Sequence, residues 1–198
     1  EGSALLKNPN LIEEIVRKVS SAISKPLTVK VRIGFENEPV DIVEIAKRIE
    51  DAGAAALAVH GRTRQQYYSG TADWDTIRRV KEAITIPVIG NGDVDSPLKA
   101  EALVKQTGCD AVMVGRAVRG NPWLFRELNH YFRTGELLER PSVEEIREMI
   151  LRHARKQIEL KGEFVGIREM RKHVAWYTAG RRHSAGLRRE SNTIESYE

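Results

Sequence analysis

The chain has 198 residues, 41% of them hydrophobic and 30% charged, which is enough for one sizeable core, or for one core and a small appendage. No apolar run approaches the roughly 20 residues that a membrane-spanning helix requires, and the first residues lack a signal-peptide pattern, so we expect a cytoplasmic protein. The formal net charge of +4 is mild and does not by itself identify a nucleic-acid-binding protein.

Helices and strands alternate through the first part of the chain. Apolar residues at helical spacing predict a helix over 11–23, and the β-branched run 27–33 predicts a strand. A second helix is expected over 40–52, with Asp41 near its start and Gly53 after its end. Strands at 56–60, 87–90 and 111–114 then alternate with helices at 74–83 and 97–106. Four apolar strands separated by helices favour parallel βαβ units, as in a (β/α) barrel or a doubly wound sheet.

The strand pattern ends after Asn121. Helices are expected at 122–131, 143–160 and 166–178, and Ser142 with Glu145 forms a capping-box sequence before the longest of them. The last ten or so residues are polar and are expected to be frayed. We therefore predict an α/β domain over 1–124 and a small all-helical domain over 125–198.

Three consecutive predicted strands end in segments rich in glycine and polar residues. They read LAVHGRTRQQYY (57–68), PVIGNGD (87–93) and AVMVGRA (111–117). Carboxyl ends of parallel strands meet at one edge, where α/β proteins bind ligands, and polar ends on three successive strands favour the barrel. Four strands cannot close an eight-stranded barrel. The chain is therefore a small open α/β sheet or the second half of a (β/α)8 TIM barrel, and the absence of a strand before Gly2 favours the half-barrel.

Lys30 and His60 are the first candidate ligand contacts. A lysine among apolar strand residues must reach an anion or an acceptor, unless it extends to water at the rim. His60, at a predicted strand end, is either a ligand contact or a hydrogen-bonded cap. Arg62 and Arg64 follow on a predicted loop with two tyrosines, a set suited to phosphates and unpaired bases.

The next two strand ends predict a phosphate site. Gly92 permits close backbone approach to a ligand, and Asn91 and Asp93 can hydrogen-bond ligand hydroxyl groups. Gly115 and Arg116 follow the last strand, where barrel enzymes commonly bind phosphate.

Basic residues are concentrated near the carboxyl end. Between 168 and 189 there are seven of them and one acidic residue, Glu169, which suits a polyanion. Arg171, Lys172 and His173 are the candidates for contact with such a backbone. The five histidines are dispersed and predict no metal site. Cys109, the only cysteine, is expected to be a small buried residue.

Longer strings make the chain resemble a known family. GSALLKNP, VKVRIG, VHGRTRQQYYSGTADW, IPVIGNGDV, TGCDAVMVGRAVRGNPWLF and EMRKHVAWY occur in this order, from Gly2 to about Leu187. They are similar to strings in bacterial tRNA-dihydrouridine synthases, most closely the B-type branch. The resemblance implies an FMN-containing (β/α)8 barrel with a helical tRNA-binding domain, reducing the uridine C5–C6 double bond with hydride ultimately from NADPH.

The same resemblance assigns expected roles to individual residues. FMN contacts are expected at Lys30, His60, Asn91, Gly92, Asp93, Gly115 and Arg116, and tRNA contacts at Arg62, Arg64, Arg171, Lys172 and His173. In the family the first four strands and the cysteine that protonates uridine C5 would lie upstream of Glu1, and Cys109 does not replace that cysteine. The chain alone is therefore expected to lack activity.

Two alternatives remain at this stage. One is another FMN-dependent (β/α)8 oxidoreductase, such as a dihydroorotate dehydrogenase-like enzyme, although the basic helical tail argues against a small-molecule substrate. The other is a non-catalytic half-barrel that binds RNA and that pairs with a second copy to close a barrel. Salt-sensitive tRNA binding without bound flavin would distinguish this alternative.

Overall fold

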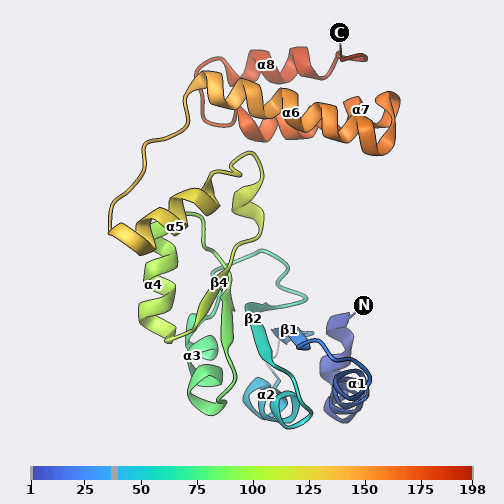
Figure 1. Cartoon of the computed structure of the whole chain (residues 1–198), viewed down its shortest axis with the longest axis vertical. Helices are drawn as coiled ribbons and strands as arrows, with labels where there is room; N and C mark the ends of the chain where they lie inside the picture. Colours follow the sequence, from blue (N-terminus) through green and yellow to red (C-terminus); the bar gives the residue numbers. More distant parts are fainter. Residues whose placement is uncertain (1, 37–39, 198) are drawn as a thin grey trace. The chain divides into compact units, whose positions relative to one another are not determined.

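A computed structural model describes residues 2–36 and 40–197 (Figure 1). The chain divides into two compact units, Glu1–Gly115 and Arg116–Glu198. The first unit contains the short 3-10 helix η1 (Gly2–Lys7), followed by α1 (Pro9–Ala22), β1 (Thr28–Gly34), α2 (Ile42–Asp51), β2 (Ala56–Thr63), α3 (Trp74–Ala83), β3 (Val88–Asn91), α4 (Pro97–Thr107) and β4 (Ala111–Met113).

The four strands of the first unit form one parallel sheet in the order β1-β2-β3-β4. This arrangement confirms the predicted α/β class, with four strands and their helices as in one half of a (β/α)8 barrel. Among the described residues, β1 and β4 each pair with one strand only and are therefore edge strands. β2 is longer than predicted, because it continues past His60 to Thr63, which pairs with Gly34.

The two faces of this sheet differ in character. Val31, Val59 and Gly90 alternate with the polar positions and lie on the face that packs against helices. A Cβ atom at Gly90 would stand 2.9 Å from Cys109 Sγ and 3.0 Å from Leu103 Cδ2 of α4, so only glycine permits this approach. Cys109 is buried. The opposite face carries the polar residues described below.

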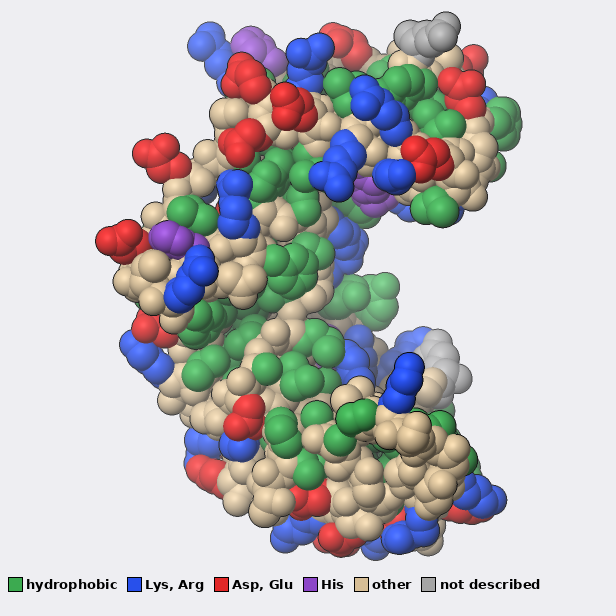
Figure 2. All heavy atoms as spheres, viewed as in Figure 1, with side chains coloured by type: hydrophobic (Ala, Val, Ile, Leu, Met, Phe, Trp, Pro, Cys, Tyr) green, Lys and Arg blue, Asp and Glu red, His purple; other side chains and the backbone are tan. Residues whose placement is uncertain are grey.

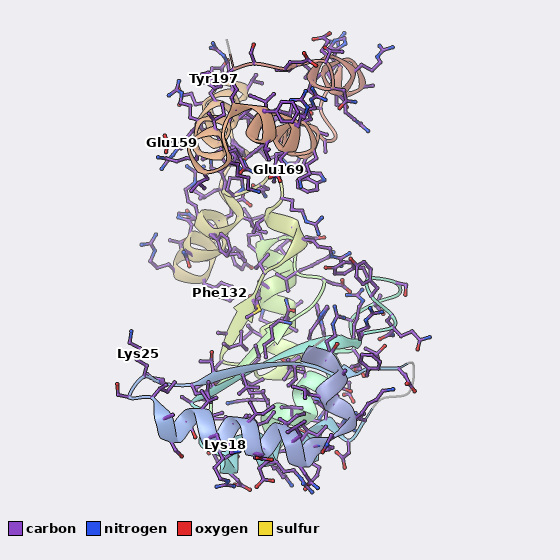
Figure 3. The ribbon with its side chains drawn as sticks, turned by 90° about the vertical axis from the view of Figure 1, so that its right-hand side faces the viewer. Lys18, Lys25, Phe132, Glu159, Glu169 and Tyr197 are labelled. Carbon is purple, nitrogen blue, oxygen red and sulfur yellow. The ribbon has the colours of Figure 1, made fainter. Side chains whose placement is uncertain are left out.

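The helix starts follow from local capping. The side chains of Asn8, Asp41, Asp73 and Ser96 each accept a hydrogen bond from a backbone N–H in the first turn of α1, α2, α3 and α4. Figure 3 shows α1 running alongside β1, with Lys18 on the exposed side of the helix. These caps fix where each helix begins, and therefore the lengths of the loops that follow the strands.

The second unit is helical, as predicted. It contains η2 (Arg116–Val118), α5 (Leu124–Thr134), α6 (Val143–Lys161), α7 (Glu163–Tyr177) and α8 (Ser184–Ser191). The capping box of Ser142 and Glu145 is confirmed. A core of Trp123, Ile146, Ala154, Met170 and Tyr177 joins the segment before α5 to α6 and α7. The helix α8 was not predicted. In the described ranges, 2–36 and 40–197, no helix has the length and apolar character needed to span a membrane.

Candidate ligand site on the sheet

Polar side chains form a row across the sheet. Arg32 of β1 pairs with His60 of β2, and His60 pairs with Asn91 of β3; the apolar Met113 of β4 follows beside Asn91. Residues paired in this way point to the same face, and so does Lys30, two positions before Arg32. The structure therefore brings together Lys30, His60 and Asn91, as predicted. It adds Arg32, which was not among the residues expected at the site from sequence.

His60 is buried without an internal partner. Its side chain belongs to a residue that is only 7% exposed, and its ring makes no hydrogen bond to any described residue. Burial lowers its pKa to about 4, and the charges of Arg32, Lys30 and Arg62 contribute in the same direction. At neutral pH the imidazole is therefore uncharged and can donate one hydrogen bond and accept another.

Lys30 and Arg32 supply positive charge beside this ring. Burial lowers the pKa of Lys30, and the neighbouring charge of Arg32 lowers it further. Arg32 donates one hydrogen bond, from Nη1 to the carbonyl oxygen of Thr63 at 3.0 Å, and neither cation pairs with a carboxylate of the described chain. We call Lys30, Arg32 and His60 the cationic face. Two partly desolvated cations without a counterion favour an anionic ligand.

Arg62 differs from these residues, and its predicted role requires correction. It lies within β2 and is 1% exposed, so it is not the solvent-facing loop residue expected to touch a substrate. Its guanidinium donates to both carboxylate oxygens of Asp93 at 2.7 Å, and to the carbonyl oxygens of Ser69 and Gly70. Asp93 also accepts from the N–H of Ala72 at 2.7 Å. The pair therefore ties the loop after β2 to the turn after β3.

The turn after β3 is shaped by its glycine. Gly92 has φ of 136°, and a Cβ atom there would stand 2.5 Å from the Ala72 Cβ and 3.4 Å from His60 Cδ2. Asn91 donates from Nδ2 to the carbonyl oxygen of Met113 at 2.7 Å, which links the ends of β3 and β4. Because Asp93 is engaged by Arg62, the turn presents Asn91 and its backbone, rather than the Asp93 carboxylate, to a ligand.

The loop after β2 exposes an aromatic pair beside the cationic face. Tyr67 and Tyr68 pack edge to face with ring centroids 4.3 Å apart, and they are 63% and 36% exposed. Arg64 is also exposed. Burial lowers the pKa of Arg32, and electrostatic interaction with Tyr68 and Tyr67 opposes this shift, so the guanidinium lies near the loop. The exposed rings agree with the sequence-based expectation of an aromatic group suited to unpaired bases.

Gly115 and Arg116 follow β4 at the border between the two units. Gly115 is exposed, and a Cβ atom built on it would meet nothing within 4 Å. Arg116 is exposed and begins η2. Both residues therefore lie at the surface, and Gly115 has room beside its backbone.

The three basic candidates of the helical unit lie on α7 in different surroundings. Arg171 donates from Nε and Nη2 to the carbonyl oxygen of Ile194, and so holds the tail that follows α8. Lys172 is exposed, whereas His173 is half-buried against the His153 ring, with centroids 4.5 Å apart. Figure 2 shows Lys and Arg side chains together with histidine over α6 and α7. Across the described parts of the chain, no group of three or more His, Cys, Asp or Glu side chains could hold a metal ion.

Fold and site together define a class: a parallel α/β protein with a desolvated cationic face on its sheet, joined to a basic helical unit. The family model of the dihydrouridine synthases (Dus) matches residues 1–198. The chain belongs to this family. It is 49% identical over 176 residues to tRNA-dihydrouridine synthase B of Shewanella oneidensis, covering 89% of this chain and 55% of that protein.

Other relatives carry the same name. The chain is 44% identical over 195 residues to tRNA-dihydrouridine synthase B of Vibrio vulnificus, covering 98% of this chain and 61% of the relative. Its identity to the protein of that name from Pseudomonas putida is 44% over 194 residues, covering 98% of this chain and 58% of the relative. The chain therefore spans somewhat more than half the length of these curated relatives.

Proposed function

We propose that the chain is part of an FMN-dependent tRNA-dihydrouridine synthase, which reduces the C5–C6 double bond of a uridine in tRNA. The cationic face carries this proposal. Its buried imidazole has no internal partner, and its two cations have no carboxylate partner in the described chain. An internal ligand with acceptor atoms and negative charge would satisfy all three groups.

A flavin fits the chemistry of these donors. Lys30 would hold the ring system, where a cation favours the anionic reduced form, and neutral His60 would hydrogen-bond to the same ligand. Asn91, the backbone of Gly92, Gly115 and Arg116 would bind the ribityl and phosphate groups. When bound, the reduced flavin supplies the hydride for uridine, and NADPH is the reductant that restores it. Asp93 would act through Arg62, by holding the two loops that frame the site.

The RNA would be held from two places. Arg64 and the tyrosine pair are exposed next to Arg32, where an unpaired base and its phosphate can approach the cationic face. The target base would be extruded from its stack, because a buried face cannot reach a base inside a helix. The helical domain, 125–198 in the sequence-based division, would contact the tRNA backbone through Lys172 and His173. With this substrate, we expect the protein to act in the cytoplasm.

The experiment is a chimera in which this chain replaces the matching part of the Shewanella oneidensis relative. We expect the chimera to bind flavin and to form dihydrouridine in tRNA from a host without its own synthases, measured by nucleoside mass spectrometry. A folded, flavin-containing chimera that leaves uridine unreduced would overturn the proposal. Salt-sensitive tRNA binding without flavin would instead favour the RNA-binding half-barrel.

The isolated 198-residue chain should behave differently from the chimera. Its single cysteine, Cys109, is buried on the helix side of the sheet beside Gly90, away from the face that carries Lys30 and His60. It therefore cannot donate a proton at that face. We expect no dihydrouridine from the isolated chain supplied with FMN, NADPH and tRNA, and product formation would contradict this assignment.

A further inference from the structure

Two distant segments of the helical unit meet at Trp176. The Arg119 guanidinium lies over the Trp176 ring, 5.1 Å from its centroid, although the two residues are far apart in sequence. The next residue, Gly120, has φ of 72°, and a Cβ atom there would stand 2.3 Å from the Trp176 carbonyl carbon. The segment before α5 is therefore pressed onto the backbone of α7, which fixes the backbone beside Arg119.

Aromatic and imidazole rings continue from Trp176 along α7 and onto α6. His173 meets Trp176 edge to face with centroids 5.0 Å apart, and it packs at a tilt against His153 of α6 with centroids 4.5 Å apart. The hydroxyl of Tyr177 lies 3.3 Å from His153 Nδ1. His153 is therefore held in the core, whereas His173 makes no hydrogen bond to any described residue.

Two cations beside this group of rings have no carboxylate partner within the described residues. Lys172 is exposed, lies one helical turn before Trp176, and has no ion pair in the described chain. Arg119 is also exposed, and it meets the indole ring without a carboxylate partner among the described residues. The acid on the same part of α7, Glu169, is paired with Lys161 at 2.6 Å. The N–H donors of Arg119 and Lys172 therefore remain available.

We propose that Arg119, Lys172, His173 and Trp176 form a platform that binds RNA backbone phosphates. The inference rests on the proposed function and names the part of the helical unit that takes the tRNA. Arg119 and Lys172 donate to phosphate oxygens, and Trp176 positions Arg119. Arg119 and Trp176 were assigned no role from sequence, because only the fold brings the GRAVRGNPW and EMRKHVAWY strings together.

His173 makes the platform sensitive to pH. Burial lowers its pKa, and the nearby charges of His153, Lys172 and Lys161 act in the same direction, whereas Glu169 opposes them. The free ring is therefore neutral at neutral pH, and a bound phosphate favours its protonated form. Affinity for RNA increases as the pH falls from 7.5 to 5.5, by about threefold or more, through proton linkage at this ring.

The test measures binding of the full 198-residue chain to an unmodified tRNA transcript by fluorescence anisotropy between 50 and 200 mM salt. Arg119→Gln and Lys172→Gln should each weaken binding several-fold and reduce the slope of log K against log salt by about 0.8, the value for one phosphate contact. Lys156→Gln is the matched control, because Lys156 is an exposed cation of α6 paired with Glu159. It should change the affinity less than about twofold, as expected for a solvated ion pair.

The pH dependence is measured with His173→Asn, which should remove the increase in tRNA affinity at low pH. If the Arg119→Gln/Lys172→Gln double variant, folded by circular dichroism, binds like Lys156→Gln with an unchanged salt slope, the platform is wrong. A chimera that forms no dihydrouridine would overturn the proposed function while leaving these binding results in place. An active chimera whose KM for tRNA is unaffected by the double variant would overturn the platform alone.

Discussion

The two units hold positive charge in different ways. In the α/β unit, Lys30 and Arg32 are fixed by strand register beside a buried imidazole, and burial lowers the pKa of all three groups. In the helical unit, Lys172 and Arg119 are exposed on a helix and on the segment that packs against it. Partly buried cations favour a compact anionic ligand, and burial shifts their pKa values. Exposed cations suit a polyanion, and their interactions weaken as the salt concentration rises. One chain thus carries two kinds of anion site.

The largest loss of stability is expected from a substitution that disrupts packing in the helical unit. Gly120→Ala places a Cβ atom 2.3 Å from the Trp176 backbone at a φ of 72°, so we expect a loss of about 4 kcal/mol in the unfolding free energy of this unit. Gly135→Ala is the control, because Gly135 has φ of 77° with nothing within 4 Å, and it should cost only about 1 kcal/mol. Equal losses in urea unfolding would show that packing at Trp176 has no special role.

Removing the carboxylate partner of Arg62 in the α/β unit should cost somewhat less stability. Asp93→Asn leaves the guanidinium of Arg62 buried without a counterion and should destabilise the unit by about 3 kcal/mol. Asp95→Asn removes an exposed partner of Lys99 and should change stability by less than about 0.5 kcal/mol. Thermal unfolding of both variants measures the difference, and similar midpoints would contradict a structural role for Arg62.

The stability of the α/β unit should also depend on pH, because His60 is buried. The pKa of His60 is about 4 in the folded chain, below the ordinary 6.5, so the unfolded state takes up the proton first as the pH falls. The stabilisation is complete above pH 6.5 and decreases toward pH 4, by on the order of 2 kcal/mol. His60→Gln should flatten this part of the curve. A parallel curve for His60→Gln would show that the ring is not desolvated.

Strand and helix order was predictable because each element has its own periodicity and caps. Asp41 and Ser142 were recognised as helix starts from sequence, and both accept the expected backbone N–H bonds. The placement of Lys30, His60 and Asn91 on one face of the sheet followed from strand alternation and parallel topology. Local sequence patterns therefore predicted the strands and turns that carry the site.

The errors arose where distant residues decide the outcome. Arg62 reads as a loop cation, and only Asp93, far along the chain, converts it into a buried strand residue. The contact of Arg119 with Trp176 depends in the same way on packing between separate helices. The helix α8 lies in a polar segment with a weak apolar pattern, so periodicity did not indicate it. Such features follow from tertiary packing, and a short stretch of sequence does not reveal them.

The cationic face is tested most directly by the FMN dissociation constant of the chimera and its Lys30→Gln variant, from quenching of flavin fluorescence. Lys99→Gln is the control, because Lys99 is an exposed residue of α4 paired with Asp95. Loss of a charge-assisted contact should weaken FMN binding about tenfold or more in Lys30→Gln and leave the control unchanged. If Lys30→Gln binds FMN as tightly as the parent chimera, the cationic face is not the flavin site.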